Sequence, residues 1–488
     1  MANQLDYPQL LKSQAYVNGE WVTAKSGKTL PVYNKATLQE IANVPSQSVA
    51  DLEPAIEAAN SAFGPWSRKT PKERHDLLAS LFQRLQTHAD DIARLIVAEN
   101  GKSLTDARGE VAYGNGYIEW FAEEALRVYG YTTPSPQPSL RNIVQWRPLG
   151  PVGIITPWNF PLAMITRKVG AALAAGCPVV IKAPSETPLT PLAVAQLASE
   201  VGIPPGVINV IVTSKGEDEM AVGRTICENP ALRKISFTGS TRVGRLLMQQ
   251  SASTLKKLSM ELGGNAPFIV FNDADIEAAA TNALACKFRG SGQTCVSANR
   301  ILVHNDVFDA FAAALTDKVR TLKVGNGMDE GTNIGPLVNE AGVNKVAKHV
   351  EEICAAGGEV LTGGQRGEGL FYSPTVVSTA PNAQQPTDME ETFGPLAALY
   401  RFHDEAEAVR LANGVDVGLA GYFFSRDVGR CFRVAEALQV GMVGINTGLI
   451  SQTTIPFGGV KQSGFGREGG PTGIREYLYE QALVFGGI

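Results

Sequence analysis

The stretch VGIITPWNFPLAMITRKVGAALAAGCPVVIKA, residues 152–183, decides the fold class. Two short apolar runs, at 152–156 and 178–182, flank a segment whose apolar residues recur three and four apart. This order is strand, helix, strand, and strands that alternate with helices form parallel sheets. The alternation continues through the strand-like runs at 207–212 and 234–237. The sequence therefore predicts an α/β fold with a parallel sheet covered by helices.

The sequence on both sides of this stretch has a different rhythm. Residues 48–128 have helical periodicity, and TTPSPQPS at 132–139 ends it, which indicates an exposed connector. A second series of strands and helices begins near residue 266 and predicts a second α/β unit. The turn-rich TTIPFGGVKQSGFGREGGP at 453–471 predicts a long loop, and loops of that length are usually functional.

Composition excludes several classes of protein. The 488 residues are 44% apolar and carry a net charge of −5, so the chain can bury a large core and has no basic character that would favour nucleic acid or an anionic membrane. No stretch is apolar over the roughly 18–20 residues of a membrane-spanning helix. The N-terminal segment lacks the basic and apolar regions of a signal peptide, so we expect a cytoplasmic protein.

Cysteine and histidine usage argues against a metal site. The 6 cysteines and 5 histidines are scattered, with no CxxC pair and no HExxH motif. We therefore expect a reduced compartment, no disulfide scaffold and no bound metal.

Two segments at strand ends could bind phosphate or ribose. In FTGSTRVG at 237–244, Gly239 and Ser240 stand where a strand meets a helix, and helix N-termini bind anions. The alternative is an ordinary turn, because the middle glycine of GxGxxG is missing. Lys182 and Ser185 follow another strand, where ligands of α/β sheets bind, but a solvated loop explains them equally well.

Three further residues could carry chemistry. Cys295 follows the small-residue loop GSGQT, where a reactive thiol fits better than a buried structural one. Glu261 stands between an apolar strand and a glycine pair, where it could act as a base, although a plain surface glutamate is the commoner case. Asn159 follows the strand at 152–156 and could donate to an oxyanion or cap a helix.

Taken together, these segments resemble the aldehyde dehydrogenase superfamily. The motifs TPWNFP, FTGS, ELGGN, GQTC, EETFGP and PFGG occur in the family's order, with matching spacing over nearly the whole chain. The resemblance implies a Rossmann-type cofactor domain, an α/β catalytic domain and a small β oligomerisation arm, in a homotetramer built as a dimer of dimers. The expected boundaries are 1–130 and 150–260 for the cofactor domain, 261–455 for the catalytic domain, 131–149 and 472–488 for the arm, and 456–471 for a loop returning to the cofactor domain.

The family's catalytic roles carry over to four residues. Cys295 looks like the nucleophile that forms a thiohemiacetal and then a thioester, and the Asn159 amide with the Cys295 backbone N–H looks like the oxyanion hole. Glu261 matches the base that activates the hydrolytic water, and Lys168 matches a lysine proposed to relay protons.

The resemblance also implies a nicotinamide cofactor, NADP or NAD. Because Ser185, with Lys182 nearby, stands where many NAD-selective relatives place a glutamate, we expect NADP to be accepted at least as well as NAD, although Glu186 could restore some repulsion. The expected cofactor contacts are Thr156, Pro157, Trp158, Lys182, Ser185, Gly239, Ser240, Leu262, Glu391 and Phe393.

Three segments resemble succinate-semialdehyde dehydrogenases, at 158–168, 287–289 and 445–451. There the positions of Arg167, Arg289 and Ser451 bind the substrate carboxylate, so we expect succinic semialdehyde to be oxidised to succinate. Many close relatives have a second cysteine two residues after the nucleophile. This chain has Ser297 there, so a disulfide switch between those positions is not available.

Other functions stay open at this point. An arginine pair binds a sulfonate nearly as well as a carboxylate, so glutarate semialdehyde or sulfolactaldehyde are alternative substrates. A dehydrogenase that transfers the acyl group to coenzyme A is disfavoured, because such relatives typically lack the glutamate base. A non-catalytic structural protein, such as a lens crystallin of this fold, is the remaining alternative.

Overall fold

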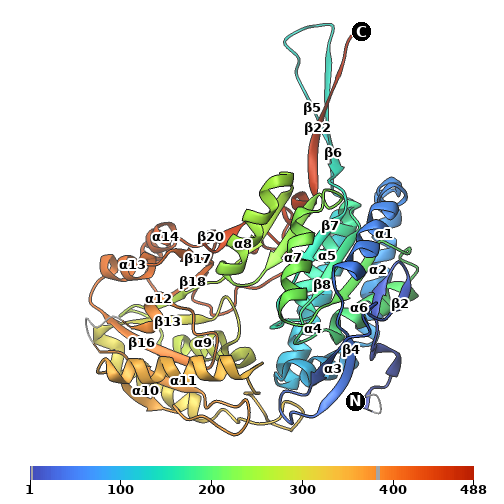
Figure 1. Ribbon diagram of the computed structural model, residues 1–488. Helices are drawn as coiled ribbons and strands as arrows, with labels where there is room; N and C mark the ends of the chain where they lie inside the picture. The colour runs from blue at the N-terminus through green and yellow to red at the C-terminus, as the bar shows by residue number, and fades with distance from the viewer. Residues whose placement is uncertain (2–3, 381–384, 488) are drawn as a thin grey trace.

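The computed structural model describes residue 1, residues 4–380 and residues 385–487, and it contains two large sheets (Figure 1). The first sheet has the order β2-β1-β9-β8-β7-β10-β11-β21, and its strands from β9 to β11 run parallel. The strands are β1 Ala15–Val17, β2 Glu20–Val22, β7 Val152–Ile155, β8 Val179–Ala183, β9 Ile208–Val212, β10 Lys234–Thr238, β11 Lys257–Glu261 and β21 Gly464–Phe465. The predicted parallel α/β sheet is confirmed.

Helices cover this sheet and supply much of the first core. Every residue of α5 is buried, and Gly170 lets it approach α4 closely, since a Cβ there would stand 3.2 Å from the Tyr117 carbonyl oxygen. The helices predicted within 48–128 are confirmed as α1 to α4. The helices of this first unit are α1 Val49–Arg68, α2 Pro71–Thr87, α3 Ala89–Asn100, α4 Leu104–Ala125, α5 Ala163–Ala175, α6 Leu189–Glu200, α7 Glu217–Glu228 and α8 Thr241–Ser251.

The second sheet has the order β14-β15-β16-β13-β12-β18-β19 and is parallel except for β14. Its strands are β12 Ala266–Val270, β13 Ala298–His304, β14 Glu359–Thr362, β15 Thr375–Ser378, β16 Leu396–Phe402, β18 Ala420–Phe424 and β19 Met442–Ile445. Its helices are α9 Ile276–Phe288, α10 Phe308–Arg320, α11 Glu340–Ala355, α12 Pro386–Met389, α13 Glu405–Asn413 and α14 Val428–Ala437. The predicted second α/β unit is therefore confirmed.

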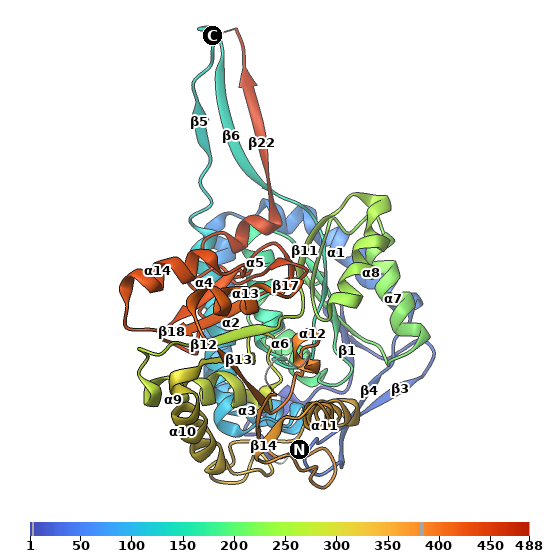
Figure 2. The same cartoon turned by 90° about the vertical axis from the view of Figure 1, so that its left-hand side faces the viewer.

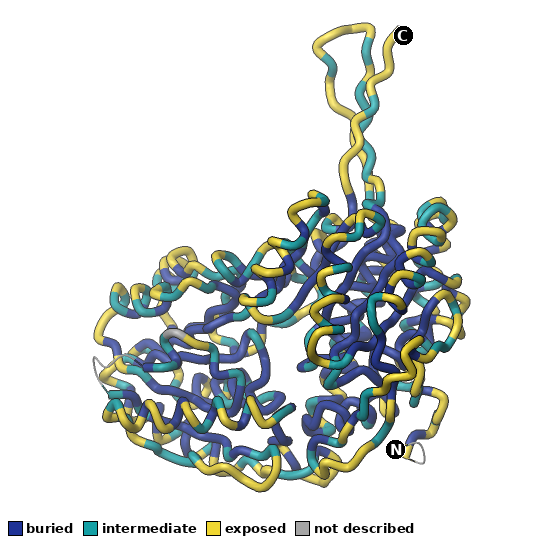
Figure 3. The backbone as a smooth tube through the Cα atoms, in the orientation of Figure 1, coloured by how far each residue is buried: buried dark blue, intermediate teal, exposed yellow. Residues whose placement is uncertain are grey.

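A three-stranded arm extends from the body, with β6 (Arg141–Pro148) between β5 (Tyr131–Thr133) and β22 (Leu478–Phe485) (Figure 2). The arm is largely exposed, whereas the interiors of the two bodies are buried (Figure 3). The exposed stretch predicted at 132–139 comprises the end of β5 and most of the turn to β6, so it connects two strands of one arm. The domain boundaries stay a prediction.

Short antiparallel pairs complete the fold. They join β3 (Thr29–Tyr33) to β4 (Glu40–Pro45) and β17 (Val417–Gly418) to β20 (Val460–Lys461). Because β20 and β21 both fall within 453–471, the predicted long loop contains two short strands, and β21 ties it to β11 of the first sheet.

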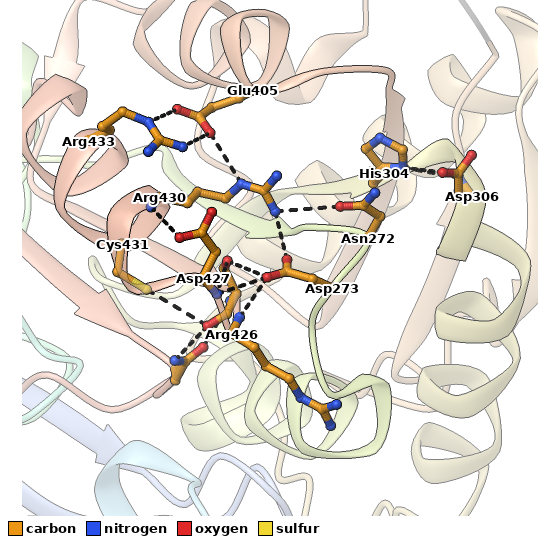
Figure 4. Close-up of polar contacts among 12 residues, drawn as sticks. Asn272, Asp273, His304, Asp306, Glu405, Arg426, Asp427, Arg430, Cys431 and Arg433 are labelled. Carbon is orange, nitrogen blue, oxygen red and sulfur yellow. Dashed lines mark hydrogen bonds and ion pairs between the residues drawn. The ribbon is translucent and has the colours of Figure 1, made fainter.

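Ion pairs hold the loops beyond β12 and β18 in place. Arg430 of α14 donates to Asp273 at 2.7 Å and to Glu405 at 3.2 Å, and Arg433 also binds Glu405 (Figure 4). These charges compensate one another, so the cluster has a structural role. Among the described residues, no group of histidine, cysteine and carboxylate side chains could hold a metal ion, and no helix is long and apolar enough to cross a membrane.

Candidate active site

A cavity of ≈ 710 Å³ lies at the carboxyl ends of β7, β10 and β11, between them and segments of the second sheet's unit. Ligands of open parallel sheets bind at this edge. The predicted site residues that line the cavity are Pro157, Trp158, Asn159, Gly239, Ser240, Leu262, Cys295, Glu391 and Phe393.

A second, smaller cavity of ≈ 150 Å³ shares Cys295 with the first. Arg167, Arg289 and Ser451, the three predicted substrate contacts, all line it. Its apolar wall comes from Tyr113, Phe160, Met164, Val296 and Phe457. The Cys295 thiol thus lies where the larger and the smaller cavity meet.

Cys295 ends a loop with an unusual backbone, residues 289–295, named the thiol loop below. Gly290, Ser291 and Gly292 all have positive φ, at 58°, 57° and 73°, and a Cβ on Gly292 would stand 2.2 Å from a carbonyl oxygen. Non-glycine residues such as Ser291 rarely adopt this conformation, so contacts around the loop must hold it. Burial raises the pKa of the half-buried Cys295 thiol to about 12, against the opposing charge of Arg167.

Asn159 lies in the loop between β7 and α5, residues 156–162, named the oxyanion loop below. Its Nδ2 donates to the carbonyl oxygen of Gln293 at 3.0 Å, which leaves its second N–H available. The helix-cap alternative is wrong, because α5 begins at Ala163 and its N-cap is Leu162. The Asn159 amide is therefore tied directly to the thiol loop.

Glu261 is the last residue of β11 and is buried. Neither of its carboxylate oxygens has a hydrogen-bond partner among the described residues. Burial first, and then the nearby negative charge of Glu468, raise the pKa of Glu261 well above its usual range. A buried carboxyl group with raised pKa and free oxygens is suited to accept a proton from a reacting group.

Sequence reasoning missed Glu468, which pairs with two of the predicted site residues. Its carboxylate forms ion pairs with Arg167 and with Lys168, whose Nζ also donates to Thr238 Oγ1 at 2.7 Å. The pKa of Glu468 is lowered although burial would raise it, because the charges of Arg167 and Lys168 outweigh burial. The only signal in the sequence was a carboxylate within the glycine-rich loop at 453–471.

This pairing changes the argument for Arg167. The resemblance predicts that Arg167 and Arg289 both bind the substrate carboxylate, but Glu468 already compensates the charge of Arg167. Arg289 differs, because within the described part of the chain its guanidinium has no ion pair or hydrogen bond, and its Cζ is 5.8 Å from the centre of the Phe160 ring. Charge compensation therefore supports an external anion at Arg289 and not at Arg167.

The larger cavity fits a dinucleotide. The N-terminus of α8 opens into it with Ser240 as cap and Thr241 and Arg242 beside it, an arrangement that suits a pyrophosphate. Glu391 lines it without an ion pair among the described residues, and burial raises its pKa to about 8. The rings of Trp158 and Phe393 meet edge to face at 5.7 Å.

Other predicted contacts lie outside this lining. Lys182 forms an ion pair with Glu219, and Ser185 donates to Glu186 at 3.1 Å. Thr156 is buried, and its hydroxyl has no partner among the described residues.

Known proteins resemble the chain over nearly its whole length. Residues 21–483 match the aldehyde dehydrogenase family. The chain is 52% identical to glutarate-semialdehyde dehydrogenase of Pseudomonas putida, over 97% of this chain and 98% of that protein. It is 52% identical to succinate-semialdehyde dehydrogenase (NADP(+)) 1 of Schizosaccharomyces pombe, over 97% and 95%. A crystal structure of succinate-semialdehyde dehydrogenase from Burkholderia pseudomallei superposes with a TM-score of 0.96 at 50% identity, covering 99% of this chain and 100% of that chain.

Proposed function

This chain belongs to the aldehyde dehydrogenase family, and from that premise we propose that it oxidises a short aldehyde with a terminal anion, foremost succinic semialdehyde to succinate. Glutarate semialdehyde and sulfolactaldehyde are the alternative substrates of the same chemistry. Release of the acyl group to coenzyme A is disfavoured by the buried carboxyl group of Glu261, whose oxygens have no hydrogen-bond partner among the described residues.

The chemistry assigned to the chain's own residues has two parts. The Cys295 thiolate adds to the aldehyde carbon, and the free N–H of Asn159 and the Cys295 backbone N–H donate to the resulting oxyanion. NAD(P), when bound, supplies the hydride acceptor that turns the thiohemiacetal into a thioester. Glu261 then takes a proton from the water that attacks the acyl carbon, and the acid leaves as the thiolate re-forms.

The cofactor site is assigned to the larger cavity. The start of α8 with Ser240 would hold the pyrophosphate, and Glu391 would accept hydrogen bonds from ribose hydroxyls. Trp158 and Phe393 would flank the reactive ring. Lys182 and Ser185 remain proposed contacts of the second ribose, and Lys168 a proposed proton relay.

The guanidinium of Arg289, which has no ion pair or hydrogen bond within the described part of the chain, carries the proposal about the substrate. It lines the ≈ 150 Å³ pocket together with the thiol and with Ser451, whose hydroxyl can add a second donor. A carboxylate at the far end of a short aldehyde would supply the missing charge, and arginine binds carboxylates with two parallel hydrogen bonds. The pocket volume favours a chain of few carbons.

Replacing Arg289 with alanine tests this assignment. We expect kcat/KM for succinic semialdehyde to fall by about 30- to 1000-fold, or about 2–4 kcal/mol, because a charged hydrogen bond in a desolvated pocket is lost. For butanal, which has no anion, kcat/KM should change by less than about threefold. Steady-state assays on both aldehydes give the comparison, and equal losses on the two would assign Arg289 a structural role.

Arg167→Ala gives a contrasting variant on the same pocket. It removes one ion-pair partner of Glu468 and leaves this buried carboxylate with Lys168 and the Ser236 hydroxyl, so we expect losses of similar size for both aldehydes. A loss confined to the anionic aldehyde would instead place Arg167 on the substrate carboxylate.

A panel of aldehydes assayed with both cofactors ranks the alternatives. We expect the highest kcat/KM for succinic semialdehyde, followed by glutaric semialdehyde and sulfolactaldehyde, and NADP should serve at least as well as NAD. Lys182 and Lys215 lie near Ser185, although Glu219 and Glu186 pair with them. A kcat/KM for NAD more than about a hundredfold above that for NADP, roughly 2.7 kcal/mol, would contradict the cofactor prediction.

We also propose a cytoplasmic homotetramer, a dimer of dimers, in which the arm of β5, β6 and β22 pairs subunits. Its exposed Tyr131, Tyr479, Val484 and Phe485 support this role.

A further inference from the structure

Helix α4 contacts the two loops that carry the donors of the proposed oxyanion hole, the oxyanion loop with Asn159 and the thiol loop with Cys295. Thr105, Asp106, Gly109, Glu110 and Tyr113, all from its first three turns, line the small pocket beside Cys295. Asp106 and Glu110 are four residues apart, so they project from one face of the helix.

Glu110 and Lys102 hold the oxyanion loop. Glu110 accepts the backbone N–H of Leu162 at 2.8 Å and pairs with Lys102 at 2.5 Å, and both side chains are buried. Lys102 Nζ also donates to the carbonyl oxygen of Asn159 at 2.7 Å. Because Lys102 and Glu110 pair with each other and both bind backbone groups of residues 156–162, they fix the backbone at Asn159.

Asp106 holds the thiol loop. Its carboxylate accepts the backbone N–H of Gly290 at 2.9 Å, at the start of the three residues with positive φ. A strained backbone persists only where surrounding contacts fix it, and here Asp106 is joined by Ser291, whose hydroxyl donates to Gly335 at 2.9 Å. Helix α4 of the first unit therefore binds the thiol loop of the second unit.

We propose that Asp106 is a positioning residue of the reaction. By binding Gly290 from the helix face that also anchors Asn159, it sets the separation between the thiol loop and the oxyanion loop. The Asn159 amide and the Cys295 N–H then converge on one oxygen. This inference rests on the proposed function, because the oxygen is that of the aldehyde.

The test compares two variants that differ in one property. Asp106→Ala removes the acceptor for the Gly290 N–H, whereas Asp106→Asn keeps an acceptor oxygen and removes the charge. Because displacement of reacting groups by about 1 Å can cost about a hundredfold, we expect D106A to lower kcat by about 10- to 100-fold. D106N should stay within about threefold of the parent, and the NADP dissociation constant should stay within about twofold in both.

Arg108→Ala is the matched control, because Arg108 is an exposed residue of the same helix, paired with Asp90 at 2.8 Å. Amide hydrogen exchange of the peptide spanning 289–295 gives a readout that needs no substrate. We expect exchange there to rise at least about tenfold in D106A and to match the parent in D106N and R108A.

Each other outcome overturns the inference. If kcat and amide exchange in D106A matched the parent, the contact between Asp106 and Gly290 would not position the thiol loop. If D106N lost as much kcat as D106A, the negative charge of Asp106 would matter and not its acceptor oxygen. Equal damage in R108A would point to a general weakening of the helix. If the parent oxidised no aldehyde, the proposed function would fail, and the exchange comparison would still decide whether Asp106 holds the thiol loop.

Discussion

Replacing Cys295 with serine should lower kcat by at least about a thousandfold while the dissociation constant for NADP stays within about twofold of the parent. A serine hydroxyl loses its proton far less readily than a thiol, and the pocket makes ionisation harder still, since burial raises the pKa of the Cys295 thiol to about 12. Cofactor contacts are assigned to other residues of the larger cavity, so binding should survive. Stopped-flow absorbance of NADPH and fluorescence titration of the cofactor measure the two quantities.

Cys286→Ala is the control for this variant. Cys286 is buried in α9 and its Sγ lies 3.8 Å from the carbonyl oxygen of Val296, so it is the other thiol close to the same segment. We expect the C286A enzyme to keep at least about a third of the parent kcat. Activity above about 1% in C295S, or a collapse in C286A alone, would move the nucleophile away from Cys295.

The sequence predicted those parts of the fold that depend on local pattern. In residues 152–183 the apolar periodicity changes from strand to helix and back, and β7, α5 and β8 follow it. The arm could not be recognised in this way, because β22 pairs with β6 across more than 300 residues, as in Leu478 opposite Pro148. Pairing over that separation depends on the folded body, and the segment at 132–139 alone indicated only an exposed connector, so the arm was expected from the family resemblance.

The residues of the site also fall into two groups, those that the local sequence indicates and those that only the fold brings together. Cys295, Asn159 and Glu261 stand in motifs, so residue type made them candidates and the family resemblance implied their roles. Glu468 and Asp106 have no such signature. Glu468 matters because it meets Arg167 and Lys168 across about 300 residues, and Asp106 because its helix reaches a loop 184 residues further along the chain. Their roles come from contacts that only the tertiary fold creates.

Glu261→Gln should strongly lower the steady-state rate but leave the first turnover of each active site intact. We expect the steady-state rate to fall by about 10²- to 10⁴-fold, because hydrolysis of the thioester needs a base and an amide cannot accept the proton of water. Acylation does not consume that base, so the burst should still approach one NADPH per active site. Burst amplitude is the readout, since the raised pKa of the Cys295 thiol slows thiolate formation in both proteins without changing how many sites acylate.

The pH dependence separates this role from a structural one. Only the ionised carboxylate of Glu261 accepts a proton, and its pKa lies well above the usual range because of burial and the charge of Glu468. The steady-state rate of the parent should therefore rise with pH through that pKa, and this limb should be missing in E261Q. Glu228→Gln, at an exposed helix end, is the control and should keep both limb and rate. If the rate of the burst fell together with the steady-state rate in E261Q, Glu261 would also be the base that deprotonates Cys295.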